Sequence, residues 1–339
     1  MTSAGAGGSP HAGLHASDNG GRARLRTVGR PLLGSPAVTG VDVVVVTYRN
    51  ADTVAAAVEP LAALDGVRVI AVDNASGDGT VEVLGTLPVE MIALDRNGGF
   101  AHGCNAGAAA GTNPYVLFLN PDARLERGAL ELLASELDGD DRIGAVAPRI
   151  VEPDGTLDYS LRRFPRLRSG LAQALFLHRL FPEEPWVDEV IRDRAVYERP
   201  HAVDWVSGAC VLVRRSVLEE IGGLDERFFH YSEDVDLCKR IWERGYEVRF
   251  VPSAVAEHEG GGSAPRAGLL PILAASRIRY SEKHDGRLVA GLVRATVALG
   301  ALTHAPVART RAARRGHLRA LGVALRPLPA QPSHLVRGT

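Results

Sequence analysis

The chain has 339 residues, of which 45% are hydrophobic, so it can fill the core of one large α/β domain with appendages. Its formal net charge of -1 gives no electrostatic reason to expect nucleic acid as a partner. The three cysteines are far apart and form no C-x-x-C pair, which argues against a disulfide framework or a thiolate zinc site and favours a reducing cytoplasm.

The N-terminal part of the chain predicts a change from disorder to regular structure. Residues 1–40 are rich in Gly, Ala, Ser and Pro without a continuous apolar run, so we expect a disordered tail and no signal peptide. Residues 41–46 are almost all Val, which is typical of a strand buried on both faces of a parallel sheet. Asp52 could cap the Ala-rich helix that follows, and Pro60 should bend or end it.

Strands and helices then alternate as far as residue 119. A second strand at 67–72 leads into a turn rich in Gly, Ser and Asp, after which Thr80 could cap a helix. Further strands are predicted at 89–94 and 115–119, with a small-residue helix near 103–110 between them. This alternation predicts right-handed crossovers and a mostly parallel, doubly wound α/β sheet with helices on both faces.

The pattern is less regular in the second half of the chain. Residues 152–155 indicate a hairpin, and the irregular stretch 162–200 is where substrate specificity could reside. Regular structure is predicted again at 203–213, followed by a helix at 215–221 that two glycines end. A further helix should begin near Asp234, where apolar residues recur at helical spacing.

The C-terminal region combines an apolar stretch with arginines. Residues 288–303 are apolar for about 16 residues, which is too short to span a bilayer comfortably, and they contain Arg294. We therefore expect a helix that lies on a surface. Because five arginines follow between 309 and 319, residues 288–320 could rest on an anionic inner leaflet, although a solvated helical appendage is the other interpretation.

Polar side chains stand at the carboxyl ends of the predicted strands, where ligands bind in parallel sheets. Asp73 could accept N–H groups or hydroxyls of a nucleoside, or it could simply cap its own turn. Asp122 could bind Mg²⁺ or Mn²⁺, or belong to an ordinary Asn-Pro-Asp turn. The glycines at 98–99 permit close approach of the backbone to a diphosphate, and equally permit a tight turn.

An acidic pair and a histidine complete the candidate site. Glu233 and Asp234 lie at a predicted helix start, where the positive end of the helix dipole stabilises a carboxylate that could remove a proton, although an Asp there is also a good N-cap. His258 follows the next predicted strand and could be a metal ligand or a packed histidine. No G-x-G-x-x-G follows the first strand, which disfavours a nicotinamide-dependent oxidoreductase.

Eight sequence blocks, taken together and in order, resemble the inverting family 2 glycosyltransferases with the GT-A fold, especially bacterial rhamnosyltransferases. The similarity covers roughly residues 41–285. The blocks are 43–48, 72–80, 96–105, 119–122, 205–210, 222–229, 232–237 and 258–263. One departure lies at Asn120, where many members of the family have the first Asp of a D-x-D pair.

The resemblance implies a role for each matching residue. Asp234 would be the catalytic base with Glu233 beside it, and Asp122 and His258 would bind Mg²⁺ or Mn²⁺. Trp205 and Gly208 would border the donor sugar and the acceptor. The nucleotide and donor site would consist of Thr47, Tyr48, Asn50, Asp73, Asn74, Arg96, Asn97, Gly98, Asn105 and Asn120.

The resemblance also implies a domain plan and a reaction. A GT-A domain at 41–265, with a nucleotide-binding half (41–150) and an acceptor and catalytic half (151–265), would precede a helical extension at 266–330. The expected reaction is metal-dependent inverting transfer of L-rhamnose from dTDP-rhamnose to a saccharide or a polyprenyl-diphosphate-linked saccharide, in a cytoplasmic protein that rests on the plasma membrane. Transfer of galactofuranose, mannose or glucose, or a catalytically silent nucleotide-sugar-binding protein, remain the alternatives, and the sequence does not fix the oligomeric state.

Overall fold

The computed structural model describes residues 40–181, 184–260 and 266–328. The expected disordered tail therefore lies outside the described residues, except for Gly40. The end of the expected extension, at 329–330, and the last three residues of the sequence block at 258–263 also lie outside them.

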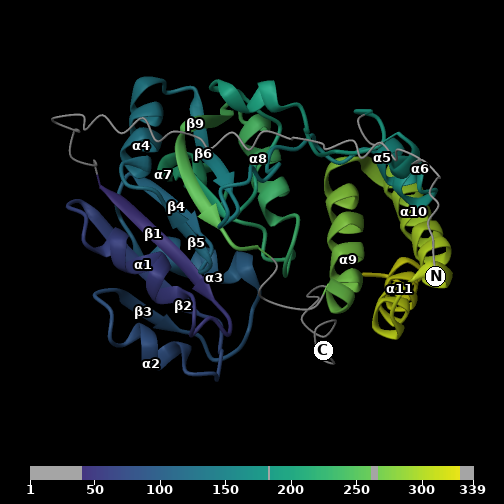
Figure 1. Ribbon diagram of the computed structural model, residues 1–339, viewed down its shortest axis with the longest axis horizontal. Helices are drawn as coiled ribbons and strands as arrows, with labels where there is room; N and C mark the ends of the chain where they lie inside the picture. The colour runs from purple at the N-terminus through teal and green to yellow at the C-terminus, as the bar shows by residue number, and fades with distance from the viewer. Residues whose placement is uncertain (1–39, 182–183, 261–265, 329–339) are drawn as a thin grey trace, which may run out of the picture. The chain divides into compact units, whose positions relative to one another are not determined.

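The first half of the sheet is parallel, as the sequence predicts. Its strands lie in the order β3-β2-β1-β4, and every neighbouring pair among them is parallel (Figure 1). Their carboxyl ends therefore meet at one edge of the sheet. The strands are β1 (Val41–Thr47), β2 (Val67–Asp73), β3 (Glu90–Ala93) and β4 (Tyr115–Leu119).

The second half of the sheet is mixed. Strand β8 runs antiparallel between β4 and β6, and β9 is parallel to β6 and antiparallel to β5 and β7. Within the regular structure expected at 203–213, the strand begins only at Cys210, and before it Trp205 forms an isolated bridge with Arg162. These strands are β5 (Ala123–Leu125), β6 (Ile143–Val151), β7 (His201–Ala202), β8 (Cys210–Arg214) and β9 (Glu247–His258).

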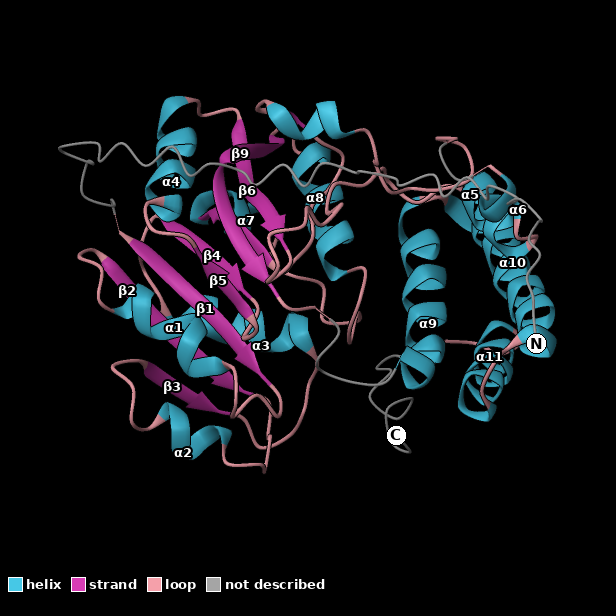
Figure 2. Ribbon diagram, viewed as in Figure 1, coloured by secondary structure: helices cyan, strands magenta, loops and turns pink. Residues whose placement is uncertain are grey.

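Helices cover both faces of the sheet (Figure 2). Successive side chains of β1 point to opposite faces, so Val43 and Val45 pack with α1, α2 and α4, whereas Val44 and Val46 pack with α3, α7 and α8. Both clusters are fully apolar at their centres, which explains the near-continuous Val run of β1. The helices are α1 (Val54–Ala62), α2 (Thr80–Leu84), α3 (Phe100–Ala110), α4 (Ala129–Gly139), α7 (Arg215–Glu220) and α8 (Glu233–Glu243).

Two predicted helix caps are wrong. The residue before α1 is Thr53, so Asp52 lies one position too early, and Thr53 itself makes no side-chain cap. Helix α2 follows Gly79, whose φ of 95° only a glycine adopts easily, and Thr80 is its first residue. The Thr80 hydroxyl donates to Asp78 Oδ1 at 2.5 Å. Pro60 lies inside α1 near its end at Ala62, as expected.

The stretch 162–200 is less irregular than predicted. It contains α5 (Leu167–Ala174), α6 (Leu177–Leu180) and the 3-10 helix η1 (Arg194–Glu198). The hairpin expected at 152–155 is confirmed, since Gly155 N donates to Glu152 O at 2.8 Å and Val151 pairs with Leu157.

Three C-terminal helices follow the sheet: α9 (Arg266–His284), α10 (Gly286–Val307) and α11 (Arg311–Ala324). Helix α10 contacts α5, where the Thr303 hydroxyl donates to Ala174 O at 2.7 Å. At 22 residues, α10 is longer than the apolar stretch expected at 288–303. Among the described residues, one helix, α10, is long and apolar enough to cross a membrane. Only 22% of its most apolar window is buried.

Candidate active site

One corner of the site is built by the pairing of β5 with β9. Ala123 lies opposite His258 in this antiparallel pair, which brings the imidazole to Asp122 just before β5. His258 Nε2 lies 3.3 Å from Asp122 Oδ1 and 3.2 Å from the side-chain amide of Asn120. The predicted site residues Asn120, Asp122 and His258 therefore lie together, although Asn120 and His258 are 138 positions apart in the chain.

This corner has the chemistry of a site for a hard divalent cation. Burial raises the pKa of Asp122, but the hydrogen bond with His258 and the charge of that imidazole together outweigh burial and leave the pKa below its ordinary value. Burial alone lowers the pKa of His258, but the hydrogen bond with Asp122 and nearby negative charge, chiefly that of Asp122, outweigh burial and raise the pKa above its ordinary value. A carboxylate, an imidazole and an amide suit Mg²⁺ or Mn²⁺, which often take their remaining ligands from phosphate and water. Within the described residues, no group of three or more His, Cys, Asp or Glu is placed to bind a metal, so this corner offers two such side chains and one amide.

The second corner is the start of α8. Asp234 accepts hydrogen bonds from Gly208 N at 3.1 Å and from its neighbour Val235 N at 2.8 Å. Burial raises the pKa of Asp234 above its ordinary value, although both backbone N–H groups favour the carboxylate. A carboxylate held in place with a raised pKa is suited to accept a proton.

Glu233 has a different environment from Asp234. Its side chain is only 5% exposed, and Oε2 is buried without a hydrogen-bond partner. Burial, followed by the charge of Asp234, raises the pKa of Glu233 well above its ordinary value. Because Glu233 is enclosed whereas Asp234 is held by two backbone N–H groups, the geometry favours Asp234 as a proton acceptor.

Two successive residues connect the two corners. Gly208 N donates to Asp234, and the next residue, Ala209, accepts from Asn120 N at 2.9 Å through its carbonyl. One short segment thus links Asp234 to the corner formed by Asn120, Asp122 and His258, which is called the cation corner below. A Cβ on Gly208 would lie 3.4 Å from Asp234 Cβ, so the glycine keeps the approach to the carboxylate open.

Trp205 lies on the same segment and is held firmly. Its indole is 8% exposed, and Nε1 donates to Arg163 O at 2.9 Å. The Arg162 guanidinium lies 5.6 Å from the centre of the indole ring, an arrangement typical of a cation–π contact. Of the two predicted pocket residues, Gly208 contacts Asp234 directly, and Trp205 lies three positions earlier on the same segment.

The predicted donor side of the site lies at the ends of β1 and β2. Asp73 is 2% exposed and accepts hydrogen bonds from the Thr47 hydroxyl at 3.1 Å and from Ser76 N at 3.0 Å. The Ser76 hydroxyl also bonds to Asp73. Sequence reasoning missed Ser76, although an Asp followed by Ser three residues later is the signal of such a turn. Much of the Asp73 carboxylate is thus used to shape its own loop.

Asn74 connects the end of β2 to the glycine-containing segment. Its amide donates to Gly99 O at 3.1 Å and accepts from Gly98 N at 3.4 Å, and Asn97 Oδ1 accepts from Gly99 N at 3.0 Å. Gly99 has a φ of 94°, and a Cβ there would lie 2.3 Å from Phe229 O. Only glycine can therefore occupy this position without a shift of the backbone.

Two of the remaining residues predicted to bind the donor, Asn50 and Asn105, hold segments of the protein through their side chains. Asn50 accepts from Tyr48 N at 2.9 Å and so shapes the loop after β1. Asn105 donates to Leu224 O and to Glu226, each at 2.9 Å, and accepts from Leu224 N. Both amide atoms of Asn105 are thus engaged with the segment before α8, which favours a role in holding that segment. Arg96 brings positive charge close to Glu226.

Comparison with known proteins identifies the family of the chain. A family model for glycosyl transferase family 2 matches residues 42–222, and one for glycosyl transferase family 21 matches residues 192–266. The chain is 33% identical over 237 residues to N-acetylglucosaminyl-diphospho-decaprenol L-rhamnosyltransferase of Mycobacterium tuberculosis, covering 65% of this chain and 76% of the relative.

Two solved structures share the fold. The crystal structure of a mycobacterial protein has a TM-score of 0.51 at 17% identity and covers 76% of this chain and 81% of that one. The structure of GalNAc-T7 with UDP, GalNAc and Mn²⁺ has a TM-score of 0.50 at 13% identity and covers 84% of this chain and 54% of that one. With the family match over more than half of its length, the chain belongs to glycosyl transferase family 2 and is a glycosyltransferase with the GT-A fold.

Proposed function

We propose that the protein is a metal-dependent inverting transferase that moves L-rhamnose from dTDP-rhamnose to a saccharide or a polyprenyl-diphosphate-linked saccharide. The observation that carries the proposal is the link between Asp234 and Asn120 through Gly208 and Ala209, because it brings a base and a cation corner to one edge of the sheet. The choice of rhamnose is supported by the 33% identity to a rhamnosyltransferase.

The cation corner fits the leaving group of such a reaction. Asp122 and His258 would hold Mg²⁺ or Mn²⁺, and the bound ion would neutralise charge on the departing nucleoside diphosphate. Asn120 offers a neutral amide where a carboxylate would add a second charge, so the diphosphate itself should contribute much of the affinity for the ion. The presence of Mn²⁺ with UDP in the GalNAc-T7 structure supports this assignment.

Asp234 would carry out the proton transfer. Its carboxylate removes the proton of the acceptor hydroxyl while the oxygen attacks the anomeric carbon, and the bond from that carbon to the diphosphate breaks. The anomeric centre is inverted because attack and departure occur on opposite sides in one step. Glu233, which is buried and whose pKa is raised well above its ordinary value, would support the helix start and would not exchange the proton.

The donor and the acceptor would lie on opposite sides of the Gly208 segment. Thr47, Asp73, Asn74 and the segment 96–98 would hold the nucleotide and diphosphate, with Tyr48, Asn50 and Asn105 shaping that surface. Trp205 would border the sugars, since it lies on the segment of Gly208, whose N–H group holds the Asp234 carboxylate. Discrimination between sugars would depend on these contacts and on residues 162–200.

A lipid-linked acceptor requires the protein to reach a membrane, and α10 offers a surface for this. Leu288, Leu292 and Leu302 recur on one face of α10 and are 79%, 46% and 55% exposed. Residues 286–328 contain eight arginines and no Asp or Glu. We infer that the protein is cytoplasmic and that residues 288–320 rest on the anionic inner leaflet, with the leucines in the interface.

A donor panel tests the proposed function. Release of nucleoside diphosphate is measured with dTDP-rhamnose and with nucleotide-activated galactofuranose, mannose and glucose, in the presence of Mg²⁺ or Mn²⁺ and of free or lipid-linked acceptors. We expect turnover with dTDP-rhamnose that EDTA abolishes. Turnover with a different donor alone would contradict the choice of rhamnose, and nucleotide binding without any turnover would indicate a silent binding protein.

A further inference from the structure

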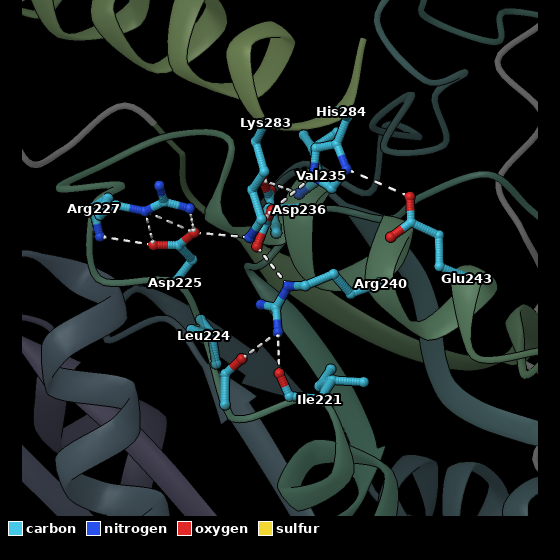
Figure 3. A network of polar contacts seen from close by, with 12 residues as sticks. Ile221, Leu224, Asp225, Arg227, Val235, Asp236, Arg240, Glu243, Lys283 and His284 are labelled. Carbon is cyan, nitrogen blue, oxygen red and sulfur yellow. Dashed lines mark hydrogen bonds and ion pairs between the residues drawn. The ribbon is translucent and has the colours of Figure 1, made fainter. Parts of the chain in front are cut away.

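One face of α9 lies along the segment that leads into the base helix α8. The Ser276 hydroxyl donates to His230 O at 2.9 Å, and one turn further on Arg279 donates to Arg227 O. Lys283 and His284, at the end of α9, reach α8 itself (Figure 3). Because these positions are spaced by three, four and one residues, they form a single face of the helix.

Asp236, two residues after the base, is the centre of these contacts. Its side chain is fully buried, and its carboxylate lies 2.6 Å from Lys283 Nζ, 2.8 Å from His284 Nε2 and 2.8 Å from Arg240 Nε. Burial raises the pKa of Asp236, but the hydrogen bond from His284 and the charges of Arg240 and Lys283 outweigh it, so the pKa is below its ordinary value. A buried carboxylate with three partners fixes its helix firmly in place.

The same network reaches the donor side of the site. Lys283 Nζ also lies 2.7 Å from Asp225, and Arg240 donates to Ile221 O at 2.8 Å and to Gly223 O at 2.7 Å (Figure 3). The segment that these residues hold ends at Phe229, whose carbonyl accepts from Phe100 N at 2.9 Å. Phe100 is the first residue of α3, directly after the predicted diphosphate segment.

The backbone before Asp234 needs such support. Tyr231 and Ser232 both have a φ of 68°, the left-handed conformation that is unfavourable for a residue other than glycine. Backbone of this kind persists where the surrounding structure fixes it on several sides. Here the support comes from Ser276 on one side and from the buried partners of Asp236 on the other.

We propose that α9 contributes to the catalytic centre. Lys283 and His284 contact Asp236, which fixes the first turn of α8 and thereby orients Asp234. Both residues lie beyond the ranges 42–222 and 192–266 that the family models match. The proposal rests on the proposed function of Asp234 as the base. Lys283, His284 and Asp236 are positioning residues that touch neither donor nor acceptor.

Hydrogen exchange tests the positioning without any substrate. In Lys283→Met, peptides that cover the start of α8 (residues 232–238) should exchange faster, while peptides from β1 and β2 should exchange as in the parent protein. The matched control is Glu282→Gln, which changes the adjacent residue of α9 and removes the negative charge that lies 2.7 Å from Arg294. Equal loss of protection throughout the protein, or none at 232–238, would overturn the proposal.

Steady-state kinetics then distinguish a positioning role of Lys283 from a general effect of its substitution on stability. Lys283→Met should lower kcat by up to about 100-fold with little change in the KM for dTDP-rhamnose, because a misplaced catalytic group reduces turnover more than binding. Lys283→Arg keeps the charge and should restore much of the loss. In an Asp234→Asn background the Lys283→Met change should cause almost no further loss, since the group that it positions is already gone.

The outcomes distinguish this proposal from the proposed function. If Asp234→Asn turns over like the parent protein, Asp234 is not the base and both proposals fail. If Asp234→Asn is impaired but Lys283→Met lowers turnover equally in both backgrounds, the proposed function stands and the positioning role is wrong.

Discussion

At the scale of single residues, Asp234 is set apart by its surroundings from the adjacent Glu233. Two backbone N–H groups hold its carboxylate, whereas Glu233 is enclosed with one oxygen unpartnered. We predict that Asp234→Asn lowers turnover by about 10²–10⁴-fold and leaves dTDP binding nearly unchanged. Turnover measured by dTDP release and affinity measured by calorimetry check this, and a matching loss of affinity would show that Asp234 binds the nucleotide instead.

The pH dependence of turnover follows from the same carboxylate. The base must be ionised, and burial raises the pKa of Asp234, so turnover should fall as the pH drops through a value above that of an ordinary aspartate. The pH profile of kcat at saturating donor and cation should show this acidic limb, and Asp234→Asn should lack it. An unchanged limb in the variant would assign the titration to another group.

The cation corner gives a second prediction at this scale. Asp122→Asn keeps the shape of the side chain but removes the charge that faces His258 and the ion. We expect weaker Mn²⁺ binding in the presence of dTDP and a higher cation requirement for turnover, which excess Mn²⁺ partly restores. Titration of Mn²⁺ by electron paramagnetic resonance measures this directly. Unchanged Mn²⁺ affinity would remove Asp122 from the ligand set.

At the scale of elements, close packing of α3 on β1 brings the donor loops together. A Cβ on Gly103 would lie 2.6 Å from Val46 Cγ1, so we expect Gly103→Ala to reduce the free energy of unfolding by about 1–3 kcal/mol. Gly139, in α4, is the matched control, because a Cβ there meets nothing within 4 Å. Urea unfolding of both variants checks the difference, and equal stabilities would contradict the packing.

Local sequence patterns predicted the parallel half of the fold well and the mixed half less well. The Val run of β1 and the apolar run of β4 indicate strands by themselves, and Gly222 and Gly223 mark a helix end. By contrast, the antiparallel direction of β8 depends on pairing with β4 and β6, distant parts of the chain. Short helices within 162–200 depend on tertiary contacts more than on periodicity.

The same distinction applies to the site. Asp122, Asp234 and His258 stand at the ends of predictable elements, so their positions could be inferred before their contacts were known. The Gly208–Ala209 link and the Lys283–Asp236 contact join residues that no local pattern relates. Sequence reasoning therefore finds the residues with chemistry and misses the residues that position them.

At the scale of the whole molecule, the exposed leucines of α10 predict attachment to a lipid surface. The protein should float with vesicles containing anionic phospholipid at low salt and should be released as the salt concentration rises. Changing Leu288, Leu292 and Leu302 together to Gln should weaken flotation, whereas Leu132→Gln, at a leucine of α4 that is 38% exposed, should not. Protein that stays in solution at low salt would rule out the attachment.

The central claim is that a base, a divalent cation and an activated sugar meet at the carboxyl edge of the sheet. The most direct test is a crystal structure with dTDP and Mn²⁺, in which anomalous scattering locates the ion. We predict an anomalous peak in contact with Asp122, His258 and the diphosphate, on the side of the Gly208 segment opposite to the indole of Trp205. A nucleotide and Mn²⁺ bound away from Asp122 and His258 would contradict the account.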